Sequence, residues 1–374
     1  MVRRGSASTA RPIEVAEREV CVRTDEQRSF VMALDHAVRE QLLRALASRL
    51  PAPVGDALAH ARRVLVLRHD RLGDMLSTLG LLRALASRGL EVDVLASDEN
   101  AVLLDHAPWV SRTIVAPAGV SGVLQLRPRL RARRYDAVVD ALVLKPAVNS
   151  RTALLMAASG ARIRAGIDGR RHDFLYTHRV RPPADDANHV EYLAELAALF
   201  TGERGMALEP TPFPISDEES RGAAAWWSTL GRGRRLLVNI SAGTADRRWP
   251  IDRFLAVLTR VRSDHPGTRV VISSAPGDRS SAQALASAVG ATLLAMPLRS
   301  AFAVVGTADV VLTPDTSIAH IAAGFQRPAI VLIARRQLQF APWRGVGHLV
   351  ISDATNLDDI GVDDIANPLN DLLG

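Results

Sequence analysis

Short apolar runs alternate with amphipathic stretches along most of the chain. In the first half, runs typical of strands are followed by patterns with apolar residues three and four positions apart, which are typical of helices. The strands predicted there span residues 64–67, 92–96, 113–116 and 137–143, and the helices span residues 73–87, 148–158 and 189–200. Strands separated by helices predict a parallel sheet with right-handed crossovers, and therefore a Rossmann-like α/β domain.

The second half repeats this alternation after a stretch that contains Pro210, Pro212 and Pro214. Strands are predicted at residues 236–240, 270–273, 291–294, 310–312 and 329–333, and helices at residues 251–263, 279–288 and 317–324. We therefore predict an α/β fold with two Rossmann-like domains, residues 63–208 and 209–374, whose parallel sheets face each other across a cleft. We allow for the last helix packing back on the first domain. Ligands of such sheets bind outside the carboxyl ends of the strands.

A helical pattern also precedes the first predicted strand. Apolar residues recur at helical spacing within residues 13–50, and Pro51 and Pro53 end the pattern. We interpret residues 1–62 as an N-terminal helical extension. The simpler hypothesis packs this arm on its own domain; the alternatives are a homodimer contact and a contact with a membrane surface.

The charge balance bears on partners and location. The net charge of +6 comes from interspersed acidic and basic residues, and no zinc-finger, RRM or basic-helix pattern is present, so we expect no nucleic-acid partner. No apolar run approaches the roughly 20 residues of a membrane-spanning helix. Glu14, Glu17 and Glu19 precede any signal-like apolar segment. We expect a cytoplasmic protein, with peripheral contact at the inner face of the cell membrane as an alternative.

The chain has one cysteine, Cys21, and one lysine, Lys145. A single thiol can form neither an intrachain disulfide nor a multi-thiolate metal site. Cys21 lies in a charged helical pattern, which favours a surface or packing role. A mechanism that needs a lysine would have to use Lys145, because all the other Lys+Arg positions are arginine.

The first candidate for chemistry is the loop from Arg68 to Asp74, between a predicted strand and a predicted helix. Gly73 allows close approach of the backbone, and Asp74 falls in the first helical turn. Free N–H groups and the helix dipole stabilise a carboxylate there by about 0.3–1 kcal/mol, which explains Asp74 without catalysis. Catalysis is the competing interpretation. The loop lacks the G-x-G-x-x-G pattern of dinucleotide-binding folds.

The second candidate is the segment from Ile240 to Pro250, again between a strand and a helix. The small residues Ser241, Gly243 and Thr244 leave backbone N–H groups free to face an anion, and Arg247 adds fixed charge, as does Arg248. A diphosphate suits that combination. The alternative is a solvated turn with Trp249 packed inside.

The third candidate is the segment from Asp315 to His320. Asp315, Thr316 and Ser317 can cap the following helix and offer its N-terminus to a phosphate. His320 lies one turn further on, and helical geometry can aim it at the same place. A structural histidine is the alternative.

Taken in order, these segments resemble glycosyltransferase family 9, the ADP-heptose heptosyltransferases. The resemblance rests on Leu-Gly-Asp after the first strand, Arg-Arg-Trp-Pro in the second half, and Pro-Asp-Thr-Ser-x-x-His-x-Ala-Ala near the end. It extends to Ala165-Gly166-Ile167 with Tyr176-Thr-His178 and to the stretch that begins His189-Val-Glu-Tyr, and so covers residues 63–350.

The resemblance implies a GT-B fold and an inverting, metal-independent transfer of heptose from ADP-heptose to an acceptor hydroxyl, such as one on lipopolysaccharide core. It implies no cofactor beyond this donor and no metal ligand. The general base of the family falls on Asp74, and Arg247 takes the place of the basic residue, often lysine, that stabilises the leaving diphosphate. Ser317 replaces the usual glycine of the family motif. The donor-binding residues implied are Ser241, Gly243, Thr244, Asp315, Thr316, Ser317 and His320, and the acceptor-side residues are Gly73, Arg68 and Arg71.

The acceptor is open at this stage. The first domain is rich in arginine, which suits a phosphorylated glycolipid or a layer of membrane headgroups, although solvated helix faces explain the same charges. These arginines are Arg127, Arg129, Arg131, Arg133, Arg134, Arg162, Arg164, Arg170 and Arg171. The N-terminal extension departs from the family and makes a protein or natural-product acceptor an alternative to a glycan or glycolipid. Three further alternatives are another nucleotide-sugar donor, a non-catalytic binding protein of the same fold, and an NAD-dependent oxidoreductase.

Overall fold

The computed structural model describes residues 38, 40–117, 119–142, 150–169, 173–181, 184 and 186–374. The contacts of the chain divide it into two units, Met1–Leu42 and Leu43–Gly374. The second unit holds both sheets, and it includes residues 43–62 of the predicted extension. Residues 40–47 are helical, whereas most of the predicted helix at 13–50 lies outside the described residues, as do Cys21, Lys145, Arg170 and Arg171.

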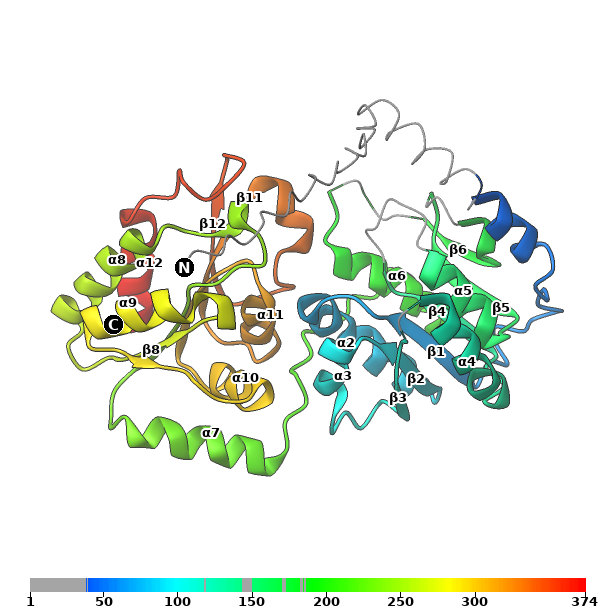
Figure 1. Ribbon diagram of the computed structural model, residues 1–374, viewed down its shortest axis with the longest axis horizontal. Helices are drawn as coiled ribbons and strands as arrows, with labels where there is room; N and C mark the ends of the chain where they lie inside the picture. The colour runs from blue at the N-terminus through cyan, green and yellow to red at the C-terminus, as the bar shows by residue number, and fades with distance from the viewer. Residues whose placement is uncertain are drawn as a thin grey trace, which may run out of the picture. The chain divides into compact units, whose positions relative to one another are not determined.

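The first sheet has six parallel strands in the order β3-β2-β1-β4-β5-β6 (Figure 1). They span β1 (Arg63–Arg68), β2 (Glu91–Ala96), β3 (Arg112–Val115), β4 (Ala137–Asp140), β5 (Ile163–Ile167) and β6 (His178–Val180). The helices of this half are α2 (Leu72–Ser87), α3 (Asp98–Ala101), α4 (Gly119–Ala132), α5 (Ser150–Ser159) and α6 (His189–Thr201). This strand order is that of Rossmann folds.

The second sheet repeats the same order with its own strands, β12-β11-β10-β7-β8-β9, and is also parallel. They span β7 (Arg235–Asn239), β8 (Arg269–Ser273), β9 (Thr292–Leu293), β10 (Val310–Pro314), β11 (Ala329–Ala334) and β12 (Gly347–Ser352). The helices are α7 (Asp217–Thr229), α8 (Ile251–Asp264), α9 (Arg279–Val289), α10 (Leu298–Gly306), α11 (Ser317–Gly324) and α12 (Asp363–Leu373). The predicted α/β class with two Rossmann-like parallel sheets is confirmed.

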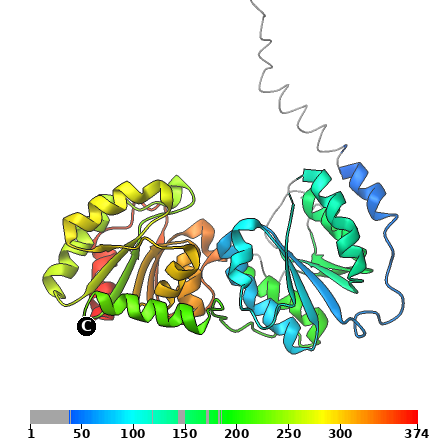
Figure 2. The same ribbon diagram turned by 60° about the horizontal axis from the view of Figure 1, so that its bottom comes forward.

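Helices cover both faces of each sheet (Figure 1, Figure 2). On the first sheet, Leu65 and Leu67 face a core shared with α4 and α5, whereas Val64 and Val66 face the core of α2 and α6. This alternation follows from the two-residue repeat of a strand, and the burial of both faces explains why the strands read as continuous apolar runs. The core around α2 continues through α10 and α11 into the second sheet, and α2 packs directly on α11.

Residues 202–216 lead from one sheet to the other, since α6 packs on α2 and α7 packs on α10. This segment contains the predicted boundary at 208/209. A division into separate domains stays a prediction, because contacts keep both halves in one unit.

Several elements differ from the sequence pattern. It does not predict β5, β6 and β12 or the helices α3, α4, α7 and α10. The last helix, α12, contacts α8, β11 and β12 and places Ile365, Leu369 and Leu373 in the core of the second sheet, in place of the packing on the first half that we allowed for. Among the described residues, no helix is both long and apolar enough to cross a lipid bilayer.

Candidate functional site

The predicted donor residues lie where the strand order of the second sheet reverses. Strands β7 and β10 are neighbours, and each is followed by a loop that leads to a helix. The first loop holds Ser241, Gly243 and Thr244, and the second holds Asp315 and Thr316. Open α/β sheets bind ligands at such a switch point, outside the carboxyl ends of the strands.

Arg247 is held between these two loops. It ends the short 3-10 helix Ala245–Arg247, and its side chain is 15% exposed. Its Nε donates to Thr244 Oγ1 at 3.1 Å, and its Nη1 donates to the Asp315 backbone carbonyl at 3.3 Å and lies 3.6 Å from Asp315 Oδ2. A Cβ added at Gly243 would lie 2.8 Å from Arg247 Nη2, so the missing side chain gives the guanidinium its place over the loop.

The residues around Arg247 anchor the loop. Trp249 is buried and donates from Nε1 to the Ile360 carbonyl at 3.0 Å, so it packs inside the turn as the alternative interpretation predicted. Arg248 instead faces outward and pairs with Asp278 at 2.7 Å. The two neighbouring arginines therefore have different surroundings, and Arg247 alone of the two lies between the loops.

Asn239, at the end of β7, joins the two loops and is a residue that sequence reasoning missed. Its Nδ2 donates to Ser241 O at 3.0 Å, to Thr313 Oγ1 at 3.0 Å and to Thr316 Oγ1 at 3.2 Å. Thr316 in turn caps α11 by accepting from Ile318 N. The predicted helix cap is therefore present, with Thr316 as its residue. Ser241 is buried, and its hydroxyl accepts from Ala275 N at 2.8 Å, so it ties this network to the loop after β8.

Asp315 is buried, and burial raises the pKa of its carboxyl above the ordinary value, although His320 and Arg247 act in the opposite direction. The pKa of His320 is lowered by burial, whereas the carboxylates of Asp315 and Asp74 raise it. The negative charges of both acids, one from each half of the chain, therefore act on His320.

The start of α2 meets α11 at Gly73. A Cβ there would lie 3.0 Å from His320 Cδ2 and 3.8 Å from Ser317 Cα, and Ser77 Oγ lies 3.2 Å from His320 Nδ1. Asp74 stands in the first turn of α2 with its side chain 16% exposed and its Oδ2 3.5 Å from Arg71 Nε. The structure thus brings together the first and third predicted segments through His320.

Arg68 and Arg71, both predicted on the acceptor side, have opposite surroundings. Arg71 is largely exposed. Arg68 is buried, where its Nε donates to Thr78 Oγ1 at 2.7 Å and its Nη1 lies 3.3 Å from Asp70 Oδ2, and its Nη2 has no hydrogen-bond partner among the described residues. These contacts tie Arg68 to the loop before α2, and its role on the acceptor side stays a prediction.

Two further polar groups lie close to these loops. His189, the first residue of α6, is buried and its Nδ1 lies 3.1 Å from the Gln339 carbonyl; burial lowers its pKa to about 3. Its ring centroid is 6.1 Å from that of His320.

Asp140 ends β4 and accepts from Tyr176 OH at 2.7 Å. Tyr176 packs over Gly166, where a Cβ would lie 2.1 Å from its ring, which explains the glycine and the tyrosine of that motif.

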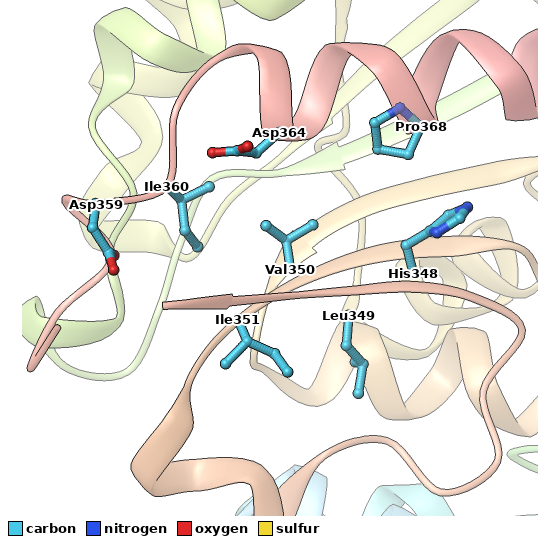
Figure 3. Close-up of a pocket in the computed structure, with 8 residues that line it drawn as sticks. All are labelled: His348, Leu349, Val350, Ile351, Asp359, Ile360, Asp364 and Pro368. Atoms are coloured by element: carbon cyan, nitrogen blue, oxygen red, sulfur yellow. The ribbon is translucent and has the colours of Figure 1, made fainter. Parts of the chain in front are cut away.

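Two of the hollows lined by described residues bear on the site. A small cavity of about 30 Å³ lies between α2, α11 and the connecting segment, and Ser77, Gly80, His320 and Trp343 are among its lining residues. A larger hollow of about 380 Å³ lies between β12 and α12, lined by residues such as His348, Ile351 and Asp364 (Figure 3). None of the predicted site residues lines the larger hollow.

Within the described residues, no group of three or more acidic, histidine or cysteine side chains is arranged to hold a metal ion.

Comparisons with known proteins identify the fold and the family. The model of glycosyltransferase family 9 (heptosyltransferase) matches residues 123–357. A search of curated proteins returns no match. Among solved structures, the chain is similar to a glycosyl transferase family 9 protein from Veillonella parvula, with 16% identity over 83% of this chain and 97% of that chain and a TM-score of 0.73.

Two Escherichia coli structures are also similar. They are ADP-heptose lps heptosyltransferase II (21% identity, TM-score 0.69) and heptosyltransferase WaaC with ADP (20% identity, TM-score 0.65). The matches cover 83% of this chain in both cases and 98% and 99% of those chains. These similarities confirm the GT-B fold that the resemblance implied.

Proposed function

Because the chain belongs to glycosyltransferase family 9, the heptosyltransferases, and is therefore a glycosyltransferase, we propose that it transfers heptose from ADP-heptose to an acceptor hydroxyl with inversion. Similar structures from Escherichia coli hold ADP and an ADP-heptose analogue, which supports this donor. A hydroxyl of lipopolysaccharide core is the acceptor we propose. A protein, a natural product or another glycan is the alternative acceptor.

The position of Arg247 is the observation on which the proposal rests most. A partly buried guanidinium stands at the switch point of the second sheet, fixed by Thr244 and Asp315, beside the capped start of α11. The leaving ADP develops negative charge on its diphosphate, and a preorganised cation in a site of low dielectric stabilises that charge strongly. The pairing with Asp315 keeps Arg247 in place before a donor arrives.

We assign the general base to Asp74. The family match begins at residue 123, so this assignment rests on the position of Asp74 at the start of α2 and on the resemblance. The Asp74 carboxylate takes the proton of the acceptor hydroxyl while that oxygen attacks the anomeric carbon. The bond from this carbon to the phosphate oxygen breaks on the opposite face, and ADP leaves with the electron pair.

We further propose that no metal takes part in this reaction, because Arg247 and the backbone N–H groups at the start of α11 can balance the charge of the diphosphate. We expect heptose transfer to continue in excess chelator. Loss of transfer in chelator that Mg²⁺ restores would contradict it.

The direct test of the base is transfer by Asp74→Asn. We expect a fall in kcat of about 10²–10⁴, the usual contribution of a general base, with the Kd for ADP unchanged. The measurement follows ADP release from ADP-heptose and the mass of the acceptor product. Asp98→Asn removes a comparable first-turn acid from α3 and should leave kcat unchanged. Turnover near the wild-type value in Asp74→Asn would exclude Asp74 as the base.

A further inference from the structure

The outer surface of α4 combines exposed apolar side chains with a concentration of arginine. Val120 is 58% exposed and Leu124 is 62% exposed, although both belong to a helix that buries Val123, Leu126 and Leu130 in the core of the first sheet. Arg127, Arg129 and Arg131 follow in the same helix and are exposed, as is Arg134 in the turn behind it. No acidic residue occurs between Pro117 and Tyr135.

The spacing places these two kinds of side chain side by side. Val120, Leu124, Arg127 and Arg131 are separated by four, three and four positions, so they follow one another along one side of the helix. Arg131 lies toward α5, because its Nη2 donates to the Ala157 carbonyl at 3.4 Å. A surface of this kind, apolar at one end and basic at the other, is typical of helices that lie in the headgroup region of a membrane.

The outer surface of α4 points away from the candidate site. Helices α4 and α5 share a core with Leu65 and Leu67 that contains no residue of the second sheet, whereas α2 and α6 cover the opposite face and reach α11. A flat partner can therefore cover α4 without touching Asp74 or Arg247. The start of α4 follows the carboxyl end of β3, which is the edge of the sheet at which the loop before α2 also begins.

We infer that α4 docks the protein on a bilayer that contains anionic lipids. Val120, Leu124 and Arg127 do so along one side of the helix, and the exposed Arg129 and Arg134 add positive charge from its other side and from the turn after it. The arginines supply attraction to lipid phosphates, and the two apolar side chains enter the acyl boundary. Nucleic acid would satisfy the arginines but would leave Val120 and Leu124 in water, so the bilayer accounts for more of the surface. This docking does not depend on the proposed chemistry.

The experiment measures binding of the full chain to sucrose-loaded vesicles by sedimentation. The vesicles are either pure phosphatidylcholine or phosphatidylcholine with 30% phosphatidylglycerol, at about 0.1 M and 0.5 M salt. We expect the wild-type protein to bind the anionic vesicles and to be released by salt. Each arginine near an anionic surface contributes about fivefold to binding, so R127E/R129E/R134E should lower the partition coefficient at least about 100-fold.

Two further variants separate the patch from the net charge. R221E/R232E/R234E reverses three exposed arginines on the second half, gives the same net charge, and should bind within twofold of wild type. V120S/L124S should lower binding about tenfold through the lost apolar contact. Circular dichroism and Tm confirm that each variant is folded.

The inference is overturned if the wild type does not bind anionic vesicles, if it binds neutral vesicles equally well, or if both charge-reversal variants lose binding equally. Tighter binding to a duplex oligonucleotide than to vesicles, unchanged in V120S/L124S, would assign the patch to nucleic acid and would also overturn it.

Discussion

The guanidinium of Arg247 owes its position to a residue with no side chain. Gly243 leaves the space that Arg247 Nη2 occupies, and an added Cβ would meet only the far end of that flexible side chain. A glycine in such a place acts on the orientation of its neighbour more than on stability.

We therefore expect Gly243→Ala to weaken ADP binding several-fold while the free energy of unfolding changes by less than about 0.5 kcal/mol. Titration calorimetry gives the affinity and urea unfolding gives the stability. Gly222→Ala, at an open position in α7, is the control and should leave ADP binding unchanged. Unaltered affinity in Gly243→Ala would show that the diphosphate does not depend on this orientation of Arg247.

Individual site residues were predictable only where a short local sequence pattern identified them. Thr316 and Asp315 could be identified because a capping sequence precedes an apolar helical run. Asn239 could not, because its partners Thr313 and Thr316 lie 74 and 77 positions away and only the pairing of β7 with β10 brings them together. Similarly, Asp140 has no local pattern, and its bond to Tyr176 spans 36 positions.

At the scale of elements, Arg299 of α10 fastens the connecting segment to both halves. It donates to both carboxylate oxygens of Glu219 at 2.5 and 2.7 Å, to the Pro214 carbonyl at 2.9 Å and to the Val102 carbonyl at 2.5 Å. The hydrogen bonds from Arg299, with those from Ser216, lower the pKa of Glu219 to about 2. Three segments far apart in sequence therefore depend on one side chain.

Arg299→Met should lower the free energy of unfolding by about 2–3 kcal/mol, because it leaves the partly buried Glu219 carboxylate without its positive partner and two carbonyls without this donor. The measurement is Tm together with the urea midpoint. Arg344→Met breaks an exposed pair with Glu209 and should cost at most about 1 kcal/mol. Equal losses of unfolding free energy in both variants would show that the contacts of Arg299 stabilise the fold no more than an exposed ion pair does.

The elements themselves were largely predictable where burial imposes an apolar run. Strands β1, β7, β10 and β11 fall within two residues of their predicted ends. Helix α7 was missed because its centre is weakly apolar, although Ser216 and Glu219 form a capping box that gives a local signal. Strand β12 lies at the edge of its sheet with mostly exposed residues, and such a strand carries no continuous apolar run.

For the whole molecule, buried and half-buried histidines make stability depend on pH. Burial lowers the pKa of His69, His178, His189 and His320, and that of His189 falls to about 3. Between the folded pKa and the ordinary value near 6.5, the unfolded chain binds more protons, so stability is present above about pH 6.5 and is lost as the pH falls.

We expect the free energy of unfolding to fall from pH 7.5 to pH 5.5, with about 1.4 kcal/mol of the fall due to His189. His189→Gln should remove that part of the slope, whereas His60→Gln, at an exposed position, should not. Urea unfolding across this pH range provides the measurement. The same slope in wild type and His189→Gln would show that the neutral form of His189 does not stabilise the fold.

Calorimetric titration of ADP shows whether the loops of the second sheet bind ADP through Arg247. Arg247→Ala should raise the Kd for ADP about 10–100-fold, because it removes a charge-assisted contact, and UDP and GDP should bind the wild type more weakly than ADP. Arg248→Ala, whose arginine faces Asp278, should bind as wild type does. Unchanged affinity in Arg247→Ala, or equal affinity for all three nucleotides, would contradict the account.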